Sequence, residues 1–165
     1  MLAGMERRQV QSSPIEVLSP DACFTLLASR SLGRLAFAVG AHAEIFPINY
    51  ALEGHIIVFR TTPHIALGVA PGIILTFEVD DWDSKQGVGW SVIAKGQAED
   101  ITHDLGRSAE HLRRVPVHPV APGERWRWLA LLPYKVSGRR FEAYSIPARR
   151  AHDWLPSPPG HYQRA

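Results

Sequence analysis

Hydrophobic and polar positions follow two different periods along this chain of 165 residues. Near the N-terminus, apolar residues recur at the spacing of one helical face, with Cys23, Leu26 and Leu27 among them. The run 19–21 (Ser-Pro-Asp) favours a helix start, because serine accepts from a free N–H, proline suits the first helical position and aspartate stabilises the positive end. The pattern predicts a short amphipathic helix that ends at Gly33 and carries Cys23 as a small hydrophobe.

After this helix the pattern changes to short runs rich in β-branched and aromatic residues, which is typical of strands. Six strands are predicted, at residues 35–39, 44–52, 55–60, 73–80, 89–101 and 126–141. Turn residues separate them, and Glu53-Gly54 is a tight hairpin signal. The acidic run 80–87 is interpreted as a hairpin loop and not as a calcium loop, because Lys85 takes a ligand position and no glutamate closes the run.

Two further helices are predicted between the strands. Thr62 caps one that runs through Val69, and Thr102 caps a longer one through Val115, where a proline ends it. Mostly antiparallel strands with a few short helices predict an α+β chain, mainly antiparallel β, built on a closed or nearly closed barrel.

Length and composition indicate one domain with two extensions. Residues 1–17 are predicted as an N-terminal arm, 18–146 as the barrel domain and 147–165 as an extended C-terminal tail. A formal net charge of +2 gives no support to nucleic-acid binding, and a single cysteine excludes a disulfide scaffold. No run of apolar residues approaches the length of a membrane helix and no signal peptide is visible, so we expect a cytoplasmic protein without a membrane partner.

Motifs for several common chemistries are missing from the sequence. The eight histidines do not fall at metal-ligand spacings, so no metal site is expected. Neither a nucleophile elbow nor a phosphate-binding glycine loop nor a dinucleotide fingerprint occurs. The sequence identifies no side chain as a general acid or base.

The most informative stretch is 46–50, followed by a hairpin and then 58–63. On adjacent antiparallel strands it places Asn49 beside the strand end that carries Arg60 and Thr61, where a capped helix is predicted to begin. An arginine and hydroxyls at such a terminus indicate an anion site.

Six motifs in this order resemble the flavin-binding proteins of the pyridoxamine 5'-phosphate oxidase-like family, over roughly residues 18–141. The motifs are Leu32-Gly33-Arg34-Leu35-Ala36, Pro47-Ile48-Asn49-Tyr50, Phe59-Arg60-Thr61, Phe77-Glu78-Val79-Asp80, Gly89-Trp90-Ser91-Val92 with Gly96, and Gly138-Arg139-Arg140. The resemblance implies a split β-barrel that forms a homodimer, with FMN bound in two clefts between the subunits. It also implies an oxidoreductase in which the flavin carries the electrons for a small-molecule substrate that the sequence does not identify.

Carried over residue by residue, the resemblance assigns the following cofactor contacts. The isoalloxazine is lined through the main chain and the Asn49 amide by Pro47, Ile48, Asn49 and Tyr50. The pyrimidine edge and the path to the phosphate fall to Phe59, Arg60, Thr61 and Thr62. Trp90 and Ser91 are expected from the partner subunit.

The chain departs from the family at the phosphate grip. Relatives often continue the helix start with Pro-Gly-Thr-Lys, whereas here the lysine position is Ala66 and the hydroxyl position is Ile65. Losing one charge-assisted contact typically weakens binding roughly ten- to hundredfold. Arg60 and His64 are expected to compensate, the histidine best when it is protonated, below about pH 6.5.

This departure leaves two alternatives to FMN open. One is the same barrel with another planar ligand, a deazaflavin coenzyme or haem. The other is a cofactor-free dimer that acts as a binding module. A true pyridoxamine phosphate oxidase is disfavoured, because no basic pocket for a second phosphate is evident.

Overall fold

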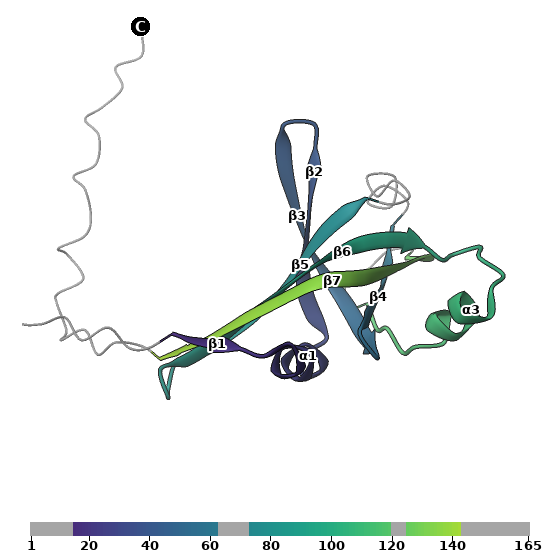
Figure 1. Cartoon of the computed structure of the whole chain (residues 1–165). Coiled ribbons are helices and arrows are strands. Elements are labelled where there is room, and N and C mark those ends of the chain that lie inside the picture. Colours follow the sequence, from purple (N-terminus) through teal and green to yellow (C-terminus); the bar gives the residue numbers. More distant parts are fainter. Residues whose placement is uncertain (1–14, 63–72, 120–124, 143–165) are drawn as a thin grey trace, which may run out of the picture.

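The computed structural model describes residues 15–62, 73–119 and 125–142, which form an antiparallel barrel with short helices (Figure 1). In chain order the elements are β1 (Glu16–Leu18), α1 (Pro20–Ala28), β2 (Leu32–Val39), β3 (His42–Glu53), β4 (Ile56–Thr61), β5 (Ile74–Asp83), β6 (Val88–Asp100), α3 (Arg107–Arg113) and β7 (Arg127–Glu142). Every strand pairing among the described residues is antiparallel, which confirms the predicted mainly antiparallel α+β class.

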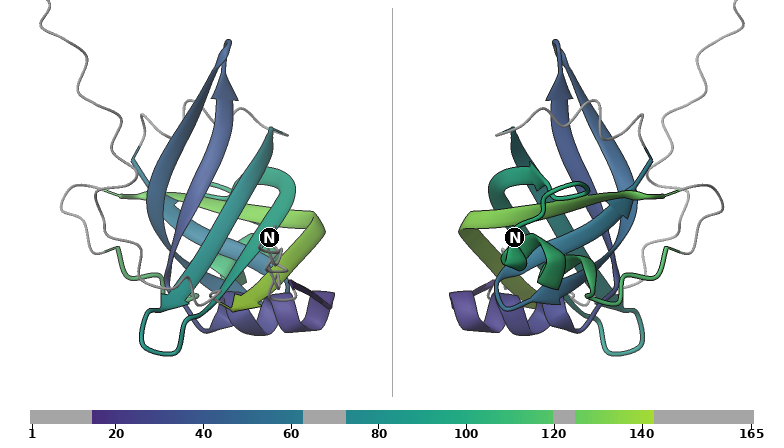
Figure 2. Two further views of the ribbon diagram at one scale, coloured as in Figure 1. Left: turned by 90° about the vertical axis from the view of Figure 1, so that its left-hand side faces the viewer. Right: turned by 90° about the vertical axis from the view of Figure 1, so that its right-hand side faces the viewer.

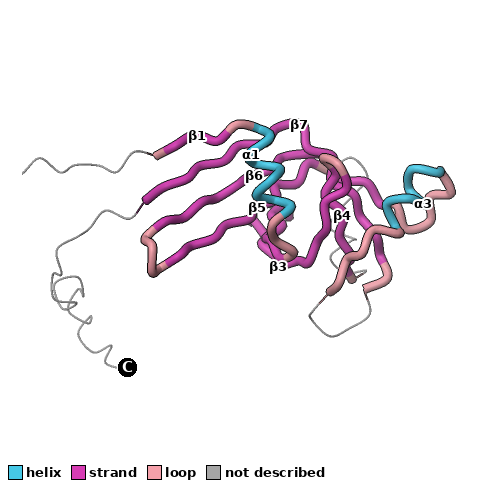
Figure 3. Tube along the Cα trace, turned by 90° about the horizontal axis from the view of Figure 1, so that it is seen from below, coloured by secondary structure: helices cyan, strands magenta, loops and turns pink. Residues whose placement is uncertain are grey.

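The barrel closes because β7 pairs on both sides. The strand order is β1-β7-β4-β3-β2-β5-β6, and β6 pairs back to β7. The first half of β7 lies between β4 and β6, whereas its second half lies between β6 and β1. β1, β7, β6 and β5 therefore extend beyond the barrel as a ribbon on one side (Figure 3).

Because successive side chains of a strand point to opposite faces, the barrel wall separates two apolar cores, one inside the barrel and one outside it. On β4, Ile57 and Phe59 are fully buried inside the barrel, whereas Val58 points outward and is buried with Leu112 of α3. α1 lies across the lower end of the barrel and contributes Cys23 and Leu27 to the inner core (Figure 2). Burial raises the pKa of the Cys23 thiol, as expected for a cysteine that packs as a small hydrophobe.

The predicted hairpins are confirmed by their turns. Gly54 has a φ of +58° between β3 and β4, in the left-handed region that glycine enters without strain. Between β5 and β6 the acidic run forms a hairpin loop, in which Asp83 Oδ1 accepts from the backbone N–H groups of Lys85 (2.8 Å) and Gln86 (3.1 Å).

The predicted end of the first helix is wrong. α1 ends at Ala28, where the backbone N–H of Ser29 donates to the Leu26 carbonyl and that of Arg30 to the Leu27 carbonyl. Gly33 lies inside β2 opposite Ile48 instead, because its missing side chain leaves room for the ring of Phe77 on β5. The predicted start is confirmed, since the Ser19 side chain accepts from the N–H of Ala22 at 3.3 Å.

The predicted start of the helix before β7 is also wrong. The Thr102 hydroxyl accepts from the backbone N–H of Trp128 at 2.8 Å, so it ties the loop to β7 and does not cap a helix. α3 begins after Gly106 and is shorter than predicted. The helix expected from Thr62 to Val69 lies almost wholly outside the described residues.

The six predicted strands are all present, with limits that differ by at most three residues from the prediction. β1 was not predicted: Glu16 and Val17, assigned to the arm, pair with Arg140 and Arg139 of β7. Its three residues are too few to show a period of their own.

Candidate functional site

The predicted site residues on β3 and β4 point to opposite sides of the barrel wall. Ile48, Tyr50, Phe59 and Thr61 are buried inside, each with at most 2% of its surface exposed. Between them, Pro47, Asn49 and Arg60 point outward, and Tyr50 pairs with Phe59 across the two strands. The predicted adjacency of these strands is therefore confirmed, and the outer face presents Pro47, Asn49 and Arg60.

Tyr50 and Asn49 both hold the turn that follows α1. The Ser31 carbonyl accepts from the Tyr50 N–H at 3.0 Å and from the Asn49 side-chain amide at 3.2 Å. The Tyr50 hydroxyl donates to the Leu27 carbonyl at 2.5 Å, and burial raises the pKa of this phenol. The N–H and the hydroxyl of Tyr50 thus both have partners within the chain. A ligand on this strand would therefore contact the main chain of the residues that precede Tyr50 in the sequence.

Arg60 lacks a carboxylate partner. Its guanidinium lies over the ring of Trp128, 5.2 Å from the ring centroid, and forms no hydrogen bond or ion pair with any described residue. The next residue, Thr61, is fully buried, and its hydroxyl also lacks a hydrogen-bond partner among the described residues. Thr62 follows, half-buried, at the last described position before the gap. The end of β4 therefore concentrates unsatisfied polar atoms, which are costly to bury without a partner.

The other half of the predicted phosphate grip cannot be placed. His64, Ile65 and Ala66 lie outside the described residues.

A hollow of about 290 Å³ lies beside Pro47, where the pairing of β2 with β5 stops at Arg34 and Glu78. The two arginines that line this hollow each form an ion pair with nearby carboxylates of the same chain. Arg34 pairs with Glu78 at 2.8 Å and also with Asp80, and these carboxylates raise the pKa of Arg34. Arg30 pairs with Asp81 and holds the pKa of that carboxyl below its usual range. This hollow suits a polar, uncharged group better than a phosphate.

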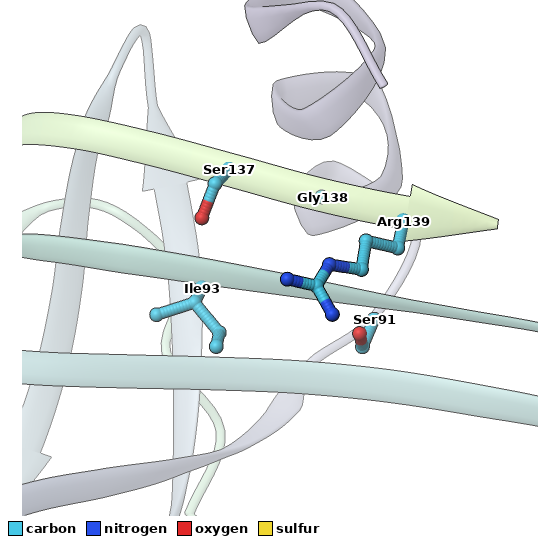
Figure 4. A pocket seen from close by; sticks show the side chains of 5 residues that line it. All are labelled: Ser91, Ile93, Ser137, Gly138 and Arg139. Atoms are coloured by element: carbon cyan, nitrogen blue, oxygen red, sulfur yellow. The ribbon is translucent and has the colours of Figure 1, made fainter. Parts of the chain in front are cut away.

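On the far side of β5 a second, smaller hollow of about 170 Å³ lies across β6 and β7 (Figure 4). Ser91, Ile93, Ser137, Gly138 and Arg139 line it. Trp90 points to the opposite face of β6, where Arg30 lies over its ring at 5.6 Å. Of the two residues predicted on this strand, only Ser91 lines the outer face.

The described ranges contain no group of three His, Cys, Asp or Glu side chains that could hold a metal ion. Nor does any helix within them have the length and apolar character needed to cross a membrane.

Comparison with known proteins identifies the family. A family model described as pyridoxamine 5'-phosphate oxidase matches residues 19–140, which is most of the chain. This chain belongs to the pyridoxamine 5'-phosphate oxidase family.

Individual known proteins align with most of this chain over nearly all of their own length. The uncharacterized protein Rv0080 of Mycobacterium tuberculosis is 30% identical over 152 residues, which cover 88% of this chain and 98% of that protein. The FAD binding protein from Mycobacterium smegmatis is 31% identical with a TM-score of 0.64, covering 77% of this chain and 98% of that one. A conserved protein of unknown function from Corynebacterium diphtheriae is 30% identical with a TM-score of 0.64, covering 78% and 98%. These matches confirm the predicted split-barrel fold.

Sequence reasoning missed two outer-face residues of this family member, Ser137 and Arg139. The sequence motifs include Arg139 but assign it no contact, and they do not include Ser137. Their proximity to Ser91 depends on the register of β6 against β7, in which Ser91 pairs with Arg139 and Ile93 with Ser137. The run Ser137-Gly138-Arg139 in a predicted strand was the available signal, but forty-odd residues separate it from Ser91.

Proposed function

We propose that the protein binds a flavin nucleotide, FMN or FAD, on the outer face of the barrel and serves as a flavin-dependent oxidoreductase. Family membership supports this proposal, as does the name of the FAD binding protein from M. smegmatis, which is 31% identical. When bound, the isoalloxazine would supply the hydride or electron transfer, so the barrel needs to bind and orient the flavin but not to provide its own redox group.

The observation that carries the proposal is the state of Arg60. Five other arginines, Arg30, Arg34, Arg114, Arg127 and Arg140, each have a carboxylate partner. Arg60 is instead positioned by the ring of Trp128, and its charge is not neutralised by any described residue. A guanidinium fixed by an aromatic ring on the outer face, with the half-buried Thr62 following at the end of β4, is suited to a flavin phosphate.

The main chain around Pro47 would meet the ring system. Pro47 lines the hollow next to β2, and β3 pairs with β4 only from Tyr50 onward, so the pairing with β4 does not cover the backbone around Pro47. Arg30 and Arg34 are held by their acidic partners, so the hollow gains no net positive charge from them. The chain's own residues would thus orient the ring at Pro47 and fix the phosphate at Arg60.

A second copy of the chain would complete this site. Pockets that enclose a cofactor or drug-sized ligand usually measure about 300–1,000 Å³, so hollows of about 290 and 170 Å³ are small for a flavin. The same outer face exposes Leu32, Ile45, Ile74 and Ile93, by 57%, 63%, 60% and 37%. Large apolar side chains on four successive strands favour contact with another protein surface, here the same face of a second copy.

Absorbance and titration test the proposal. The purified protein is expected to carry, or to take up from added FMN or FAD, a flavin with its characteristic absorption band. A deazaflavin band or a Soret band in the isolated protein would assign the barrel to the other planar ligands. A protein that remains colourless and binds none of them would favour the cofactor-free module and contradict the proposal.

The variant Arg60→Gln should weaken FMN or FAD binding roughly ten- to hundredfold, because a charge-assisted contact is lost. Riboflavin, which has no phosphate, should bind the variant and the wild type alike. Arg114→Gln is the matched control, since it removes the same charge from an exposed i,i+4 pair on α3. Equal effects of both variants on FMN binding would show that the charge acts only at long range.

A further inference from the structure

The small hollow on β6 and β7 has polar groups from two adjacent strands on one face. Ser91 pairs with Arg139 and Ile93 with Ser137, so these four side chains lie on neighbouring positions of the outer surface. Figure 4 shows the Arg139 side chain extending over β6 between Ile93 and Ser91, with the Ser137 hydroxyl on the same side. An arginine fork and two hydroxyls therefore converge on one hollow of about 170 Å³.

Gly138 contributes to this geometry from the other side of the strand. A Cβ on Gly138 would lie 2.7 Å from the Cys23 Sγ of α1, so the glycine lets α1 pack closely beneath β7. Ser137 and Arg139 on either side are then fixed on the outer face.

The acidic residues nearest to this hollow are paired with other arginines. Asp80, the strand partner of Ser91, accepts from Arg34, as does Glu78, the strand partner of Ile93. Arg139 forms no ion pair or hydrogen bond with a described residue. Its neighbour Arg140, on the opposite face of β7, is paired with Glu16 at 3.3 Å.

We propose that the hollow formed by Ser91, Ser137 and Arg139 is an oxyanion subsite, which takes a phosphate or carboxylate group. Guanidinium and hydroxyl donors match the acceptor oxygens of such a group, and Ile93 offers an apolar contact for the carbon skeleton beside it. The proposal rests on the proposed function in one respect: the anion belongs either to the flavin or to a substrate bound next to it.

This subsite is distinct from the end of β4. Arg60 pairs in register with Trp128, which is eleven residues from Arg139 along β7. Eleven strand residues span at most about 36 Å when fully extended. Arg60 and Arg139 therefore lie beside opposite ends of β7 and belong to separate sites within one copy.

Binding of inorganic phosphate to Arg139→Gln, followed by calorimetry or ³¹P NMR, tests the subsite itself. The variant is expected to bind phosphate roughly ten- to hundredfold more weakly than the wild type. Arg140→Gln is the matched control, because it removes the same charge at the next residue but on the opposite face, and it should change phosphate binding less than twofold. An Arg139→Gln variant that binds phosphate as tightly as Arg140→Gln would overturn the proposal.

Flavin titrations distinguish the two sources of the anion. If the anion is the flavin's, Arg139→Gln weakens FMN or FAD binding but leaves riboflavin binding unchanged. If it is the substrate's, Arg139→Gln leaves the flavin affinities unchanged, and the flavin-loaded variant binds phosphate more weakly than the flavin-loaded wild type. Both results support the subsite.

A wild type that binds no flavin yet binds phosphate through Arg139 would refute the proposed function and leave the subsite standing. If the wild type binds flavin but Arg139→Gln leaves phosphate binding unchanged, the proposed function stands and the subsite is refuted.

Discussion

Arginines on this barrel differ chiefly in what neutralises them. Arg34 is held by Glu78 and Asp80 on the neighbouring strand, whereas Arg60 rests on Trp128 without a described acidic partner. Solvent-exposed ion pairs such as those of Arg34 contribute little to stability. They do determine which arginines keep a positive charge that an anionic ligand can bind. Arg60 and Arg139 keep that charge, and Ser91 and Ser137 place hydroxyl groups beside Arg139.

At the residue scale, Gly96 is expected to tolerate no side chain. A Cβ there would lie 2.2 Å from the Leu132 carbonyl oxygen, at the bulge where β6 changes register against β7 and Tyr134 is left unpaired. Replacing glycine by alanine raises the free energy of unfolding by about 0.4–1 kcal/mol where the backbone allows it, because the unfolded chain becomes less flexible. The displacement of packed backbone atoms typically lowers it by about 1–3 kcal/mol, so the net effect here is destabilising.

Gly96→Ala should therefore lower the free energy of unfolding by about 1–2 kcal/mol, measured by urea denaturation. Gln97→Ala, at the exposed neighbouring position, should change it by less than about 0.5 kcal/mol. A Gly96→Ala variant as stable as Gln97→Ala would show that the bulge relaxes around a methyl group.

At the scale of elements, α1 is attached to the barrel through Tyr50 as much as through its apolar face. Cys23 and Leu27 pack in the inner core, and the Tyr50 ring packs edge-on to Phe77 at 4.8 Å between centroids. Its hydroxyl donates to the Leu27 carbonyl at the last turn of α1, which also accepts from the backbone N–H of Arg30 at 3.4 Å. One aromatic side chain thus joins β3, β5 and the end of α1.

The raised pKa of Tyr50 predicts a pH dependence of stability. The native state keeps the phenol neutral at pH values where the unfolded chain loses this proton, near the ordinary value of 10.0. The contribution is complete below that value and declines as the pH rises above it, by up to about 1.4 kcal/mol per pH unit. Urea denaturation of the wild type from pH 9 to 11.5 should follow this decline.

Tyr50→Phe removes the titrating group and serves as the reference. At pH 8 it should be less stable than the wild type by about 1–2 kcal/mol, because a buried hydrogen bond is lost. Above about pH 10 the difference should shrink, since only the wild type then loses stability through this group. A constant difference up to pH 11.5 would contradict the buried, neutral phenol.

The sequence predicted which strands and helices exist more accurately than where they end or how the side chains of the candidate site pair. Strand periodicity and the turn at Gly54 identified six strands, because burial alternates regularly along them. The C-terminal end of α1 and the loop before α3 involve the tertiary hydrogen bonds of Tyr50 and Thr102, which no local sequence signal carries. Likewise, the pairing of each arginine depends on strand register, so the distinction between Arg34 and Arg139 became visible only in the fold.

At the scale of the whole molecule, the outer face of the barrel has the character of a contact surface. Leu32, Ile45, Ile74 and Ile93 are all substantially exposed there, whereas Val58 of β4 and Ala130 of β7, which also point outward, are covered by α3. Both hollows open on this uncovered side. Association of two copies through it would bury the apolar side chains and enclose the hollows together, which links assembly to flavin binding.

The double variant Ile45→Lys/Ile74→Lys tests this link, because neither side chain lines a hollow. Placing charges at four symmetry-related positions should weaken dimerisation more than hundredfold, or about 3 kcal/mol or more, as measured by analytical ultracentrifugation. The far-ultraviolet circular dichroism should stay unchanged, since both isoleucines are exposed by about 60%. The affinity for flavin should fall together with the affinity of the two copies for each other.

Leu105→Lys is the control. This leucine is 93% exposed in the loop before α3, so neither dimerisation nor flavin binding should change. A wild type that is monomeric at micromolar concentration while holding flavin would separate binding from assembly and place the whole site within one copy.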